Sequence, residues 1–393
     1  MKKKPVGIIL AIAIFVGLPA SAFSVDSALD PFVHNLVSAM PKDRNYMISP
    51  FSLKMVLAMA ANGAGGDTRK EILDALGIAD LGRYNSHARA FIESSNKNRA
   101  VEFNMANSIW NNTDRFADLD LEFSDEFEEI VADYFGGTAR NINNANGAKT
   151  INDWIALQTR DRIKNGISDD VIRGSLSFLV NAIYFKGDWL VPFRVGATKD
   201  GIFTDRNGQK NTTAFMTHTD DYSYFTDDHV QMLAKPYMDR NIQMYFVLPK
   251  SGEAAREEYI KPYIFGDALD RMTSTEIRFM LPKFKTEYLH DNLLNIMRGM
   301  GVQAAFNDAK ADFLSMFSKK PPLNVYIDSI IQKTFIEVDE KGTEAAAATS
   351  IVEIAHSSMG PPIFFICNRP FFYFIRNDAT GEILFMGEYA FVE

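Results

Sequence analysis

The hydrophobic positions of the chain repeat with a helical period in some stretches and with a strand period in others. Apolar residues three and four apart predict helices over residues 30–40, 51–61, 67–76, 151–163 and 293–299. The second of these stretches is apolar almost all round, as in a buried helix, and it begins after Pro50. The glycines within residues 62–66 end it, and we expect Asp67 and Thr68 to cap the helix that follows.

Short runs of β-branched and aromatic residues predict strands, and most of them fall in the second half of the chain. They cover residues 46–49, 101–107, 178–185, 232–236, 243–248, 277–284, 363–366 and 371–375. No internal repeat, charge block or linker interrupts this pattern. With 393 residues, of which 47% are apolar, the chain can bury a large core. We therefore expect one α+β domain.

One segment near the C-terminus combines conflicting signals. Residues 342–349 form an alanine-rich run that favours a helix, whereas residues 350–354 are β-branched and favour an extended chain. Residues 360–362, Gly-Pro-Pro, then break any regular element. Small side chains flanked by strands fit both an exposed loop and a slot within a sheet. The segment is therefore predicted to switch between two states.

The first 22 residues have the composition of a secretory signal peptide. Three lysines form a basic head, residues 6–18 form an apolar centre, and residues 20–22, Ala-Ser-Ala, resemble a cleavage site. A transmembrane anchor is the alternative, but the apolar run is shorter than the roughly 20 residues of a span and ends at Pro19. We expect residues 1–22 to be removed and one domain, 23–393, to be secreted to the extracellular space, or to the periplasm of a Gram-negative cell.

Charge and motif content exclude several function classes. Removing the three lysines of the signal peptide from 41 basic residues, against 50 acidic ones, lowers the net charge from −9 to −12. This balance disfavours nucleic acid and anionic membrane as partners. The Gly-x-Ser-x-Gly and His-Glu-x-x-His motifs are absent, and the six histidines lack metal-ligand spacing. The single cysteine, Cys367, stands in an apolar run and is interpreted as a buried small hydrophobe.

Five segments, in order, resemble the serpin family of protease inhibitors. Residues 340–349, Glu-Lys-Gly-Thr-Glu-Ala-Ala-Ala-Ala-Thr, are similar to the hinge of its inhibitory members. Residues 368–387 are similar to its C-terminal strands, and residues 45–52, 65–73 and 179–189 to three further segments. The resemblance spans roughly Ala28 to Glu393. Together with the signal peptide, it identifies the chain as an inhibitory serpin, and we expect a prokaryotic secreted one.

The resemblance implies a metastable fold of three β-sheets and about nine helices, with an exposed reactive-centre loop over about residues 340–362. A serine endopeptidase, or a cysteine one, attacks this loop as a substrate. Once acylated, the cut loop inserts as a new strand into the central sheet and traps the covalent acyl complex. The resemblance implies no catalytic residues, no cofactor and no metal, and we expect a monomer.

The implied hinge is made of Glu340, Gly342, Thr343, Glu344, Ala345, Ala346, Ala347, Ala348 and Thr349. Alternation along an inserted strand would turn Thr343, Ala345, Ala347 and Thr349 inward, followed by Ile351 and by Glu353, which is the awkward member. About ten new backbone hydrogen bonds at ~1 kcal/mol each rival the stability of a whole domain, roughly 5–15 kcal/mol. The uncut form must then be held by a kinetic barrier.

The resemblance also assigns a reactive bond. Family spacing counted from Glu340 puts it between His356 and Ser357, within about residues 355–359. Neither Lys nor Arg occurs between Gly342 and Asn368. Trypsin-like targets, which need a basic residue at the cut bond, are therefore disfavoured.

The resemblance also assigns five further residues to the opening of the central sheet. Ser49, Ser52, Asn181 and Gln332 are expected to form a hydrogen-bonded cluster beneath it, and Trp189 to lie at its top. Gln332 stands where many relatives have histidine. Because an amide cannot become cationic, any pH response assigned to that histidine is in doubt here.

The sequence is compatible with two other functions. A non-inhibitory family member would act as a carrier or chaperone, and a secreted hydrolase is a remote alternative without a supporting motif. Arg83, Arg89, Lys97 and Arg99 are basic enough for a polyanion site, but scattered solvated charges account for these residues better.

Overall fold

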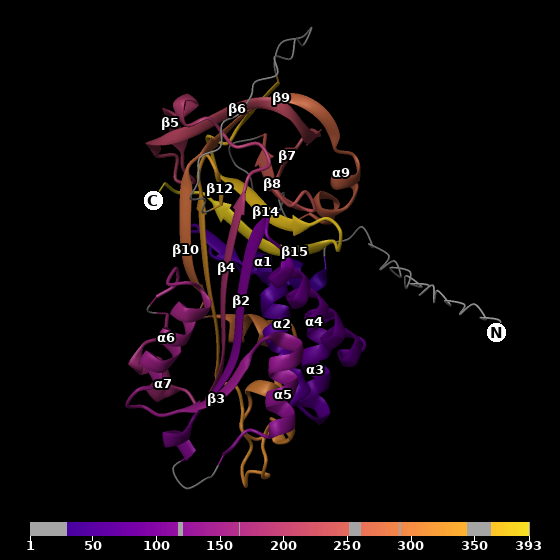
Figure 1. Ribbon diagram of the computed structural model, residues 1–393, viewed down its shortest axis with the longest axis vertical. Coiled ribbons are helices and arrows are strands. Elements are labelled where there is room, and N and C mark those ends of the chain that lie inside the picture. The colour runs from indigo at the N-terminus through magenta and orange to yellow at the C-terminus, as the bar shows by residue number, and fades with distance from the viewer. Residues whose placement is uncertain are drawn as a thin grey trace, which may run out of the picture.

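The structure is a computed structural model that describes residues 30–116, 121–164, 166–250, 261–290, 292–343 and 363–392 (Figure 1). Nine α-helices lie within these ranges: α1 (Pro31–Ser38), α2 (Pro50–Asn62), α3 (Gly66–Leu76), α4 (Leu81–Lys97), α5 (Asp125–Phe135), α6 (Gly147–Gln158), α7 (Asp169–Gly174), α9 (Asp267–Asp270) and α10 (Leu293–Gly299). Helices α1 and α2 each begin with proline, whose missing N–H has no partner at a helix start anyway.

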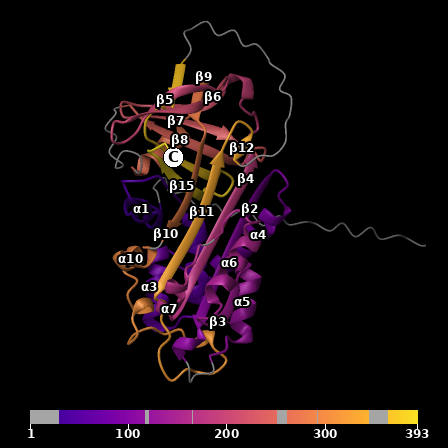
Figure 2. The same cartoon turned by 90° about the vertical axis from the view of Figure 1, so that its left-hand side faces the viewer.

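The central sheet has six strands in the order β10-β11-β12-β4-β2-β3. Its members are β2 (Val101–Asn112), β3 (Thr138–Ile142), β4 (Ser177–Asp188), β10 (Phe284–His290), β11 (Ser329–Val338) and β12 (Gly342–Thr343). Strands β4 and β11 run side by side along the molecule, with β12 at their upper end (Figure 2). They pair in parallel from Phe178 and Ser329 to Tyr184 and Phe335.

Helices cover both faces of the central sheet (Figure 1). Nearly every residue of α2 is buried, and this helix packs with α3, α4 and α5 against one face. Helices α6 and α7 cover the other face. Successive residues of β4 alternate between the two cores, so that Leu179 faces the larger core and Val180 the smaller one.

A second sheet of nine strands forms the other end of the molecule. Its order is β1-β15-β14-β8-β7-β6-β9-β13, with β5 added to β6. The strands are β1 (Tyr46–Ile48), β5 (Lys199–Thr204), β6 (Lys210–Thr226), β7 (Val230–Pro236), β8 (Ile242–Pro249), β9 (Thr273–Pro282), β13 (Ile363–Ile366), β14 (Phe371–Asn377) and β15 (Glu382–Tyr389).

The described strands thus hydrogen-bond into two sheets where the resemblance implies three. The reason lies in β6, which is 17 residues long. Its first part pairs with β5, its middle with β9 and its last residues with β7. One long strand therefore joins two groups of strands into a continuous sheet.

Most predicted elements are present, but several boundaries and one cap differ. The helix predicted over 151–163 is α6, which begins at Gly147 and ends at Gln158, and the strand predicted over 277–284 is two strands, β9 and β10. Thr68 does not cap α3, because Gly65 occupies the N-cap position. The Thr68 side chain is buried, and its hydroxyl accepts a hydrogen bond from the Asp312 N–H at 3.0 Å.

The predicted signal peptide lies outside the described residues. Within the described ranges, no helix is long and apolar enough to cross a membrane.

Candidate functional site

The two residues of β12 occupy a wedge between β4 and β11. Thr343 pairs with Val338 of β11 and with Gly187 of β4, and it runs antiparallel to both. Below this point β4 and β11 bond directly to each other. Two residues of the predicted hinge have therefore entered the central sheet, at the end that we call the top of the sheet (Figure 2).

A glycine is required where this chain passes β4. A Cβ atom at Gly342 would lie 2.1 Å from the carbonyl oxygen of Gly187 and 2.7 Å from Cα of Asp188. Both obstacles are backbone atoms, which no side-chain rotation can move away. Only glycine lets the two backbones come this close.

A short segment after β4 holds the chain in place. Residues 189–193, which we call the clamp, grip residues 339–343, which we call the strap. The Trp189 N–H donates to the Lys341 carbonyl at 2.8 Å, and the Phe193 N–H to the Glu340 carbonyl at 2.7 Å. The Trp189 indole Nε1 donates to the Asp339 carbonyl at 3.1 Å. The clamp thus satisfies three successive carbonyls of the strap.

Aromatic rings continue this grip into the sheet. The Trp189 ring stacks on Tyr237, with ring centroids 4.5 Å apart and an interplanar angle of 16°. The Tyr237 hydroxyl lies 2.7 Å from Oγ1 of Thr343, which is fully buried. Burial raises the pKa of Tyr237, so the hydroxyl stays neutral and keeps this bond at physiological pH. Thr343 therefore faces inward, as alternation predicts for the first inserted position.

Glu340 anchors the strap electrostatically. Its Oε2 lies 2.9 Å from Nζ of Lys283, and its Oε1 accepts a hydrogen bond from the Thr198 hydroxyl at 2.7 Å. Burial alone would raise the pKa of Glu340, but the hydrogen bonds from Lys283 and Thr198 outweigh burial and hold it below its usual value. The strap is therefore pinned by an ionised carboxylate at neutral pH.

The middle of the central sheet is closed by neutral amides and hydroxyls. The structure brings together Ser49, Ser52, Asn181 and Gln332, all at most 1% exposed. Gln332 Nε2 donates to the Ser49 carbonyl at 3.0 Å and to Asn181 Oδ1 at 2.7 Å, and its Oε1 accepts from the Ser49 N–H at 2.9 Å. We call this group the amide cluster.

The amide cluster ties three strands of the sheet to α2 and to β15. Asn181 Nδ2 donates to Asn107 Oδ1 at 2.8 Å, and also to the Ser52 hydroxyl. The Ser49 hydroxyl donates to the Leu384 carbonyl at 2.6 Å and also caps α2 by accepting from the Ser52 N–H at 3.2 Å. A strand that passes between β4 and β11 has to break the Gln332–Asn181 bond. The predicted residues are thus in contact, while their role during insertion stays a prediction.

Other predicted site residues lie elsewhere or outside the described range. Glu344 to Thr349 and the predicted reactive bond, His356–Ser357, lie outside the described residues. Cys367 is fully buried and burial raises its pKa well above the usual value, which confirms its interpretation as a small hydrophobe. On α4, Arg89 pairs with Asp133 at 2.9 Å and Lys97 lies 4.0 Å from Glu93, so cations and acids alternate there.

Several residues of the site were not found from the sequence. Asn107, Lys283 and Tyr237 all contact the predicted residues, but nothing in the local sequence marks them as functional. Asn107 and Asn181 are 74 positions apart in the chain, and Tyr237 and Thr343 are 106 apart. Lys283 and Glu340 are 57 apart, so no local motif links any of these pairs.

Comparison with known proteins identifies the family. A family model described as "Serpin (serine protease inhibitor)" matches residues 27–391. Glia-derived nexin of Homo sapiens is 31% identical and covers 90% of this chain and 89% of its own length. Leukocyte elastase inhibitor of Xenopus tropicalis is 30% identical, with 88% and 93% covered. The chain therefore belongs to the serpin family.

Solved structures agree with this assignment. The thermophilic serpin Tengpin in its native state superposes with a TM-score of 0.83 at 27% identity, and the match covers 93% of both chains. Human thyroxine-binding globulin complexed with thyroxine has a TM-score of 0.81 at 22% identity and covers 93% of this chain and 97% of its own. The serpin fold expected from the sequence is confirmed.

Proposed function

We propose that the protein is an irreversible suicide-substrate inhibitor of serine endopeptidases, with cysteine endopeptidases as a further possibility for the same loop. The observation that carries the proposal is the position of β12, which is wedged between β4 and β11 and runs antiparallel to both. Because β4 and β11 are parallel to each other, a longer antiparallel strand between them would pair with both along its whole length.

The covalent step follows the chemistry of acyl transfer. The hydroxyl of the protease serine adds to the carbonyl carbon of His356, the bond to the Ser357 nitrogen breaks, and that nitrogen leaves as an amine with the proton. The ester joins the protease to the cut loop. Insertion of residues 344–354 below Thr343 would then carry the protease away before water hydrolyses the ester.

The described residues support the first step of this insertion. Thr343 already fills an inward position with a small side chain. The alanine-rich residues 344–349 follow at once in the sequence, so the next inward positions, Ala345 and Ala347, need little space. The gap between β4 and β11 can open one residue pair at a time only if the entering side chains are small.

The target class follows from the loop composition. The absence of Lys and Arg between Gly342 and Asn368 disfavours proteases that need a basic residue at the cut bond. One relative carries elastase inhibition in its name, leukocyte elastase inhibitor. We propose elastase-like, chymotrypsin-like, subtilisin-like or papain-like targets, in preference to trypsin-like ones.

A protease panel with two variants tests the function. The mature protein should form a complex with an elastase- or chymotrypsin-type enzyme that survives boiling in detergent, and mass spectrometry should place the cut at His356–Ser357. Thr343→Arg should be cleaved at the same bond without complex, because the buried Thr343 site has no room for a charge. Glu337→Arg, at an exposed position of β11, is the matched control and should still trap the enzyme. A stable complex with Thr343→Arg would contradict the insertion mechanism.

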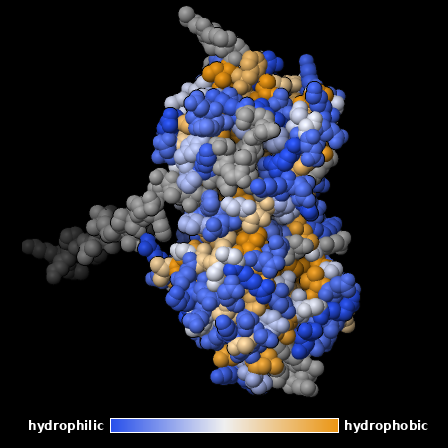
Figure 3. All heavy atoms as spheres, turned by 180° about the vertical axis from the view of Figure 1, so that it is seen from behind, coloured by the Kyte–Doolittle hydropathy of each residue, from blue (hydrophilic) through white to orange (hydrophobic). Residues whose placement is uncertain are grey.

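Export and oligomeric state are part of the proposal. The first 22 residues support secretion with cleavage after Ala22, which N-terminal sequencing of the exported protein tests. The face seen in Figure 3 is mostly hydrophilic, with hydrophobic residues in small separate patches, which supports a monomer. Size-exclusion chromatography with light scattering measures the mass directly.

One observation favours a second function, the carriage of a small molecule. A cleft of about 560 Å³ lies between α1, α2, α4 and the turn from β14 to β15. Apolar side chains line much of it, and the Tyr84 hydroxyl beside it is buried without a hydrogen-bond partner. Such a group suits one hydrogen bond from an apolar ligand.

Thermal unfolding before and after cleavage of the loop separates the two functions. An inhibitor should gain large stability when the loop is cut, because the new strand lowers the free energy of the sheet. A carrier without insertion should unfold at the same temperature in both states. Thyroxine, the ligand of the thyroxine-binding globulin complex, is a suitable first probe for the cleft.

A further inference from the structure

A lysine is buried beneath the clamp without a carboxylate partner. Lys235, on β7, is 1% exposed. Its Nζ donates to the Val191 carbonyl, in the middle of the clamp, at 2.7 Å. The remaining surroundings are aromatic, because Nζ lies 4.5 Å from the ring centroid of Phe193, 5.3 Å from Trp189 and 5.5 Å from Tyr222.

The three rings and one carbonyl solvate the Lys235 ammonium less well than water does. Cation–π contact with three rings is favourable, but an ammonium has three donors, and removal of a cation from water costs more than such contacts return unless an anion is near. Burial accordingly lowers the pKa of Lys235 to about 7, although Asp220 acts in the opposite direction.

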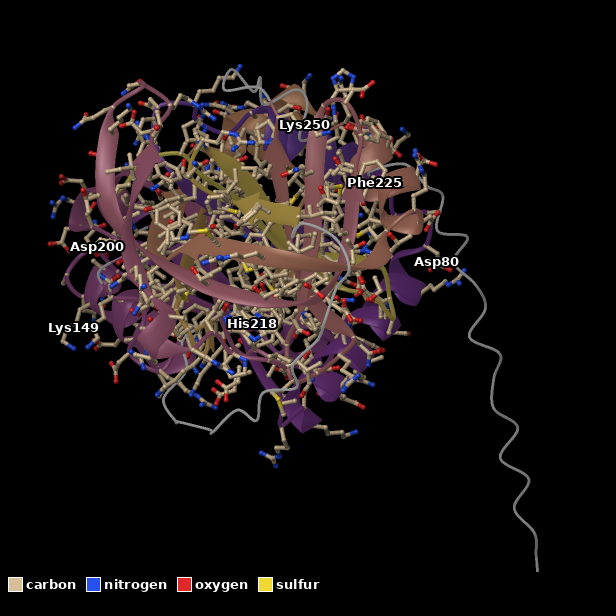
Figure 4. All side chains as sticks on the ribbon, turned by 90° about the horizontal axis from the view of Figure 1, so that it is seen from above. Asp80, Lys149, Asp200, His218, Phe225 and Lys250 are labelled. Atoms are coloured by element: carbon tan, nitrogen blue, oxygen red, sulfur yellow. The ribbon has the colours of Figure 1, made fainter. Side chains whose placement is uncertain are left out.

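The charged and titratable groups around Lys235 are already engaged with other residues. On β6, the Tyr222 hydroxyl lies 3.1 Å from Nδ1 of His218, and this histidine lies 4.0 Å from Asp220. Figure 4 looks down on this end of the molecule and labels His218. On the strap, Glu340 pairs with Lys283. Burial raises the pKa of Tyr222 and of Tyr237, so neither supplies an anion at neutral pH.

A second buried lysine provides a contrast within the same chain. Lys333, on β11, is 7% exposed, but its Nζ lies 2.8 Å from Oε1 of Glu287 and donates to the Lys164 carbonyl at 2.6 Å. Its charge is therefore matched. Of the two buried lysines in the described ranges, Lys235 is the one held by a carbonyl and aromatic rings without a carboxylate.

We propose that Lys235 is a positioning residue that weakens the grip of the clamp on the strap, so that the top of the sheet opens more readily for the entering strand. Its ammonium is bound to the clamp through Val191 and to the rings of Trp189 and Phe193, which themselves hold the strap. Opening of the clamp gives this ammonium access to water. The closed state therefore carries a cost that the open state does not. This inference rests on the proposed inhibitory function.

The lowered pKa of Lys235 makes the stability of the closed clamp depend on pH. The ordinary lysine pKa is 10.5, and the buried value is about 7. Between these values the opened or unfolded protein binds a proton that the closed protein does not, so the closed state gains about tenfold in equilibrium constant per pH unit as the pH rises. Below pH 7 the cost is fully present.

Two substitutions test the proposal without a protease. Lys235→Met removes the charge at similar length, and Lys333→Met removes a paired charge as the matched control. The urea midpoint of each uncut protein is measured at about pH 7 and about pH 9.5. Uptake of a synthetic peptide with the sequence of residues 343–354 is followed on native gels, which reports opening of the sheet.

We expect Lys235→Met to raise the urea midpoint at pH 7, to reduce its rise with pH and to take up the peptide about tenfold more slowly than wild type. Lys333→Met should lower the midpoint and keep the wild-type pH dependence. A lower midpoint for Lys235→Met would overturn the proposal, as would an unchanged rate of uptake. If Lys235→Met does not fold, wild type alone decides, since its uptake should slow from pH 7 to 9.5. Failure of every protein, wild type included, to take up the peptide would count against sheet insertion itself.

Discussion

The top and the middle of the central sheet differ in how β4 and β11 are connected. In the middle, the two strands bond directly, and an amide cluster of uncharged groups seals them to α2. At the top, β12 separates the strands, and an ion pair, stacked rings and a buried lysine surround it.

The middle of the sheet is closed, whereas the top already has a strand between β4 and β11. The side chains of the amide cluster are hydrogen-bonded to one another and to the backbone. A strand that passes between β4 and β11 must therefore replace several of these hydrogen bonds together. The top already admits a chain, and its contacts can be released singly. If the loop inserts as proposed, the barrier against spontaneous insertion lies in the middle of the sheet, and the top sets how insertion starts.

The largest expected effect lies in the middle. Asn181→Leu should destabilise the protein by about 2–4 kcal/mol, because Asn107, Gln332 and Ser52 each lose a buried partner. Urea unfolding of the uncut protein measures this. The matched control is Asn111→Leu, since Asn111 is also fully buried on β2 but neither polar atom of its side chain has a partner. That variant should be neutral or more stable. Equal losses in both variants would show that the amide cluster contributes nothing beyond packing.

The next effect concerns the entrance. Gly342→Ala should cost about 1–3 kcal/mol, because its Cβ meets the backbone of Gly187 and Asp188. We expect the strap to leave the sheet, which frees the Trp189 indole from Asp339 and changes the tryptophan fluorescence. A spectrum identical to that of wild type would contradict the close approach at the top. Gly196→Ala is the matched control, because a Cβ at Gly196 meets open space. Gly208 is unsuitable as a control because its φ is 79°, which strains any residue other than glycine.

The smallest effect is a dependence on acid pH. The pKa of Glu340 is lowered in the folded state, so its ion pair contributes stability that is present above the ordinary value of 4.5 and is lost as the pH falls through the folded value. Since Lys283 is 42% exposed, we expect only about 1 kcal/mol. Glu340→Gln should reduce the change of the urea midpoint with pH between about pH 6 and pH 3. The uncharged groups in the middle of the sheet should not contribute to this pH dependence. If the urea midpoint of Glu340→Gln changes with pH as in wild type, the titrating group lies elsewhere.

Much of the fold could be predicted because its signals are local. Helix α2 is apolar all round and α10 has a clear helical spacing, and both have bounds close to those predicted. Helix α4 was missed because it is mostly polar, with only Asn85 and Ala88 buried. Strand β11 was missed because its buried run contains the polar residues Gln332, Lys333 and Thr334. Its sequence therefore shows neither a continuous apolar run, as β4 does, nor a regular alternation.

For the site, residue types were predictable and contacts were not. The resemblance to the family points to Ser49, Asn181 and Gln332, and the structure brings them into contact. Lys235 gave no signal in the sequence, because a lysine in a strand is by default a solvated residue. Only the packing of the clamp above it makes its charge costly.

The sequence by itself determined the family, the order of elements and the small side chains of the hinge, because these depend on local composition and on similarity along the chain. The tertiary structure alone decided that the strap is wedged between two parallel strands, that neutral amides close the sheet below it and that a lysine lies unmatched beneath the clamp. These features arise from residues far apart in the chain. Their energies depend on burial and on partners, which only the folded molecule supplies.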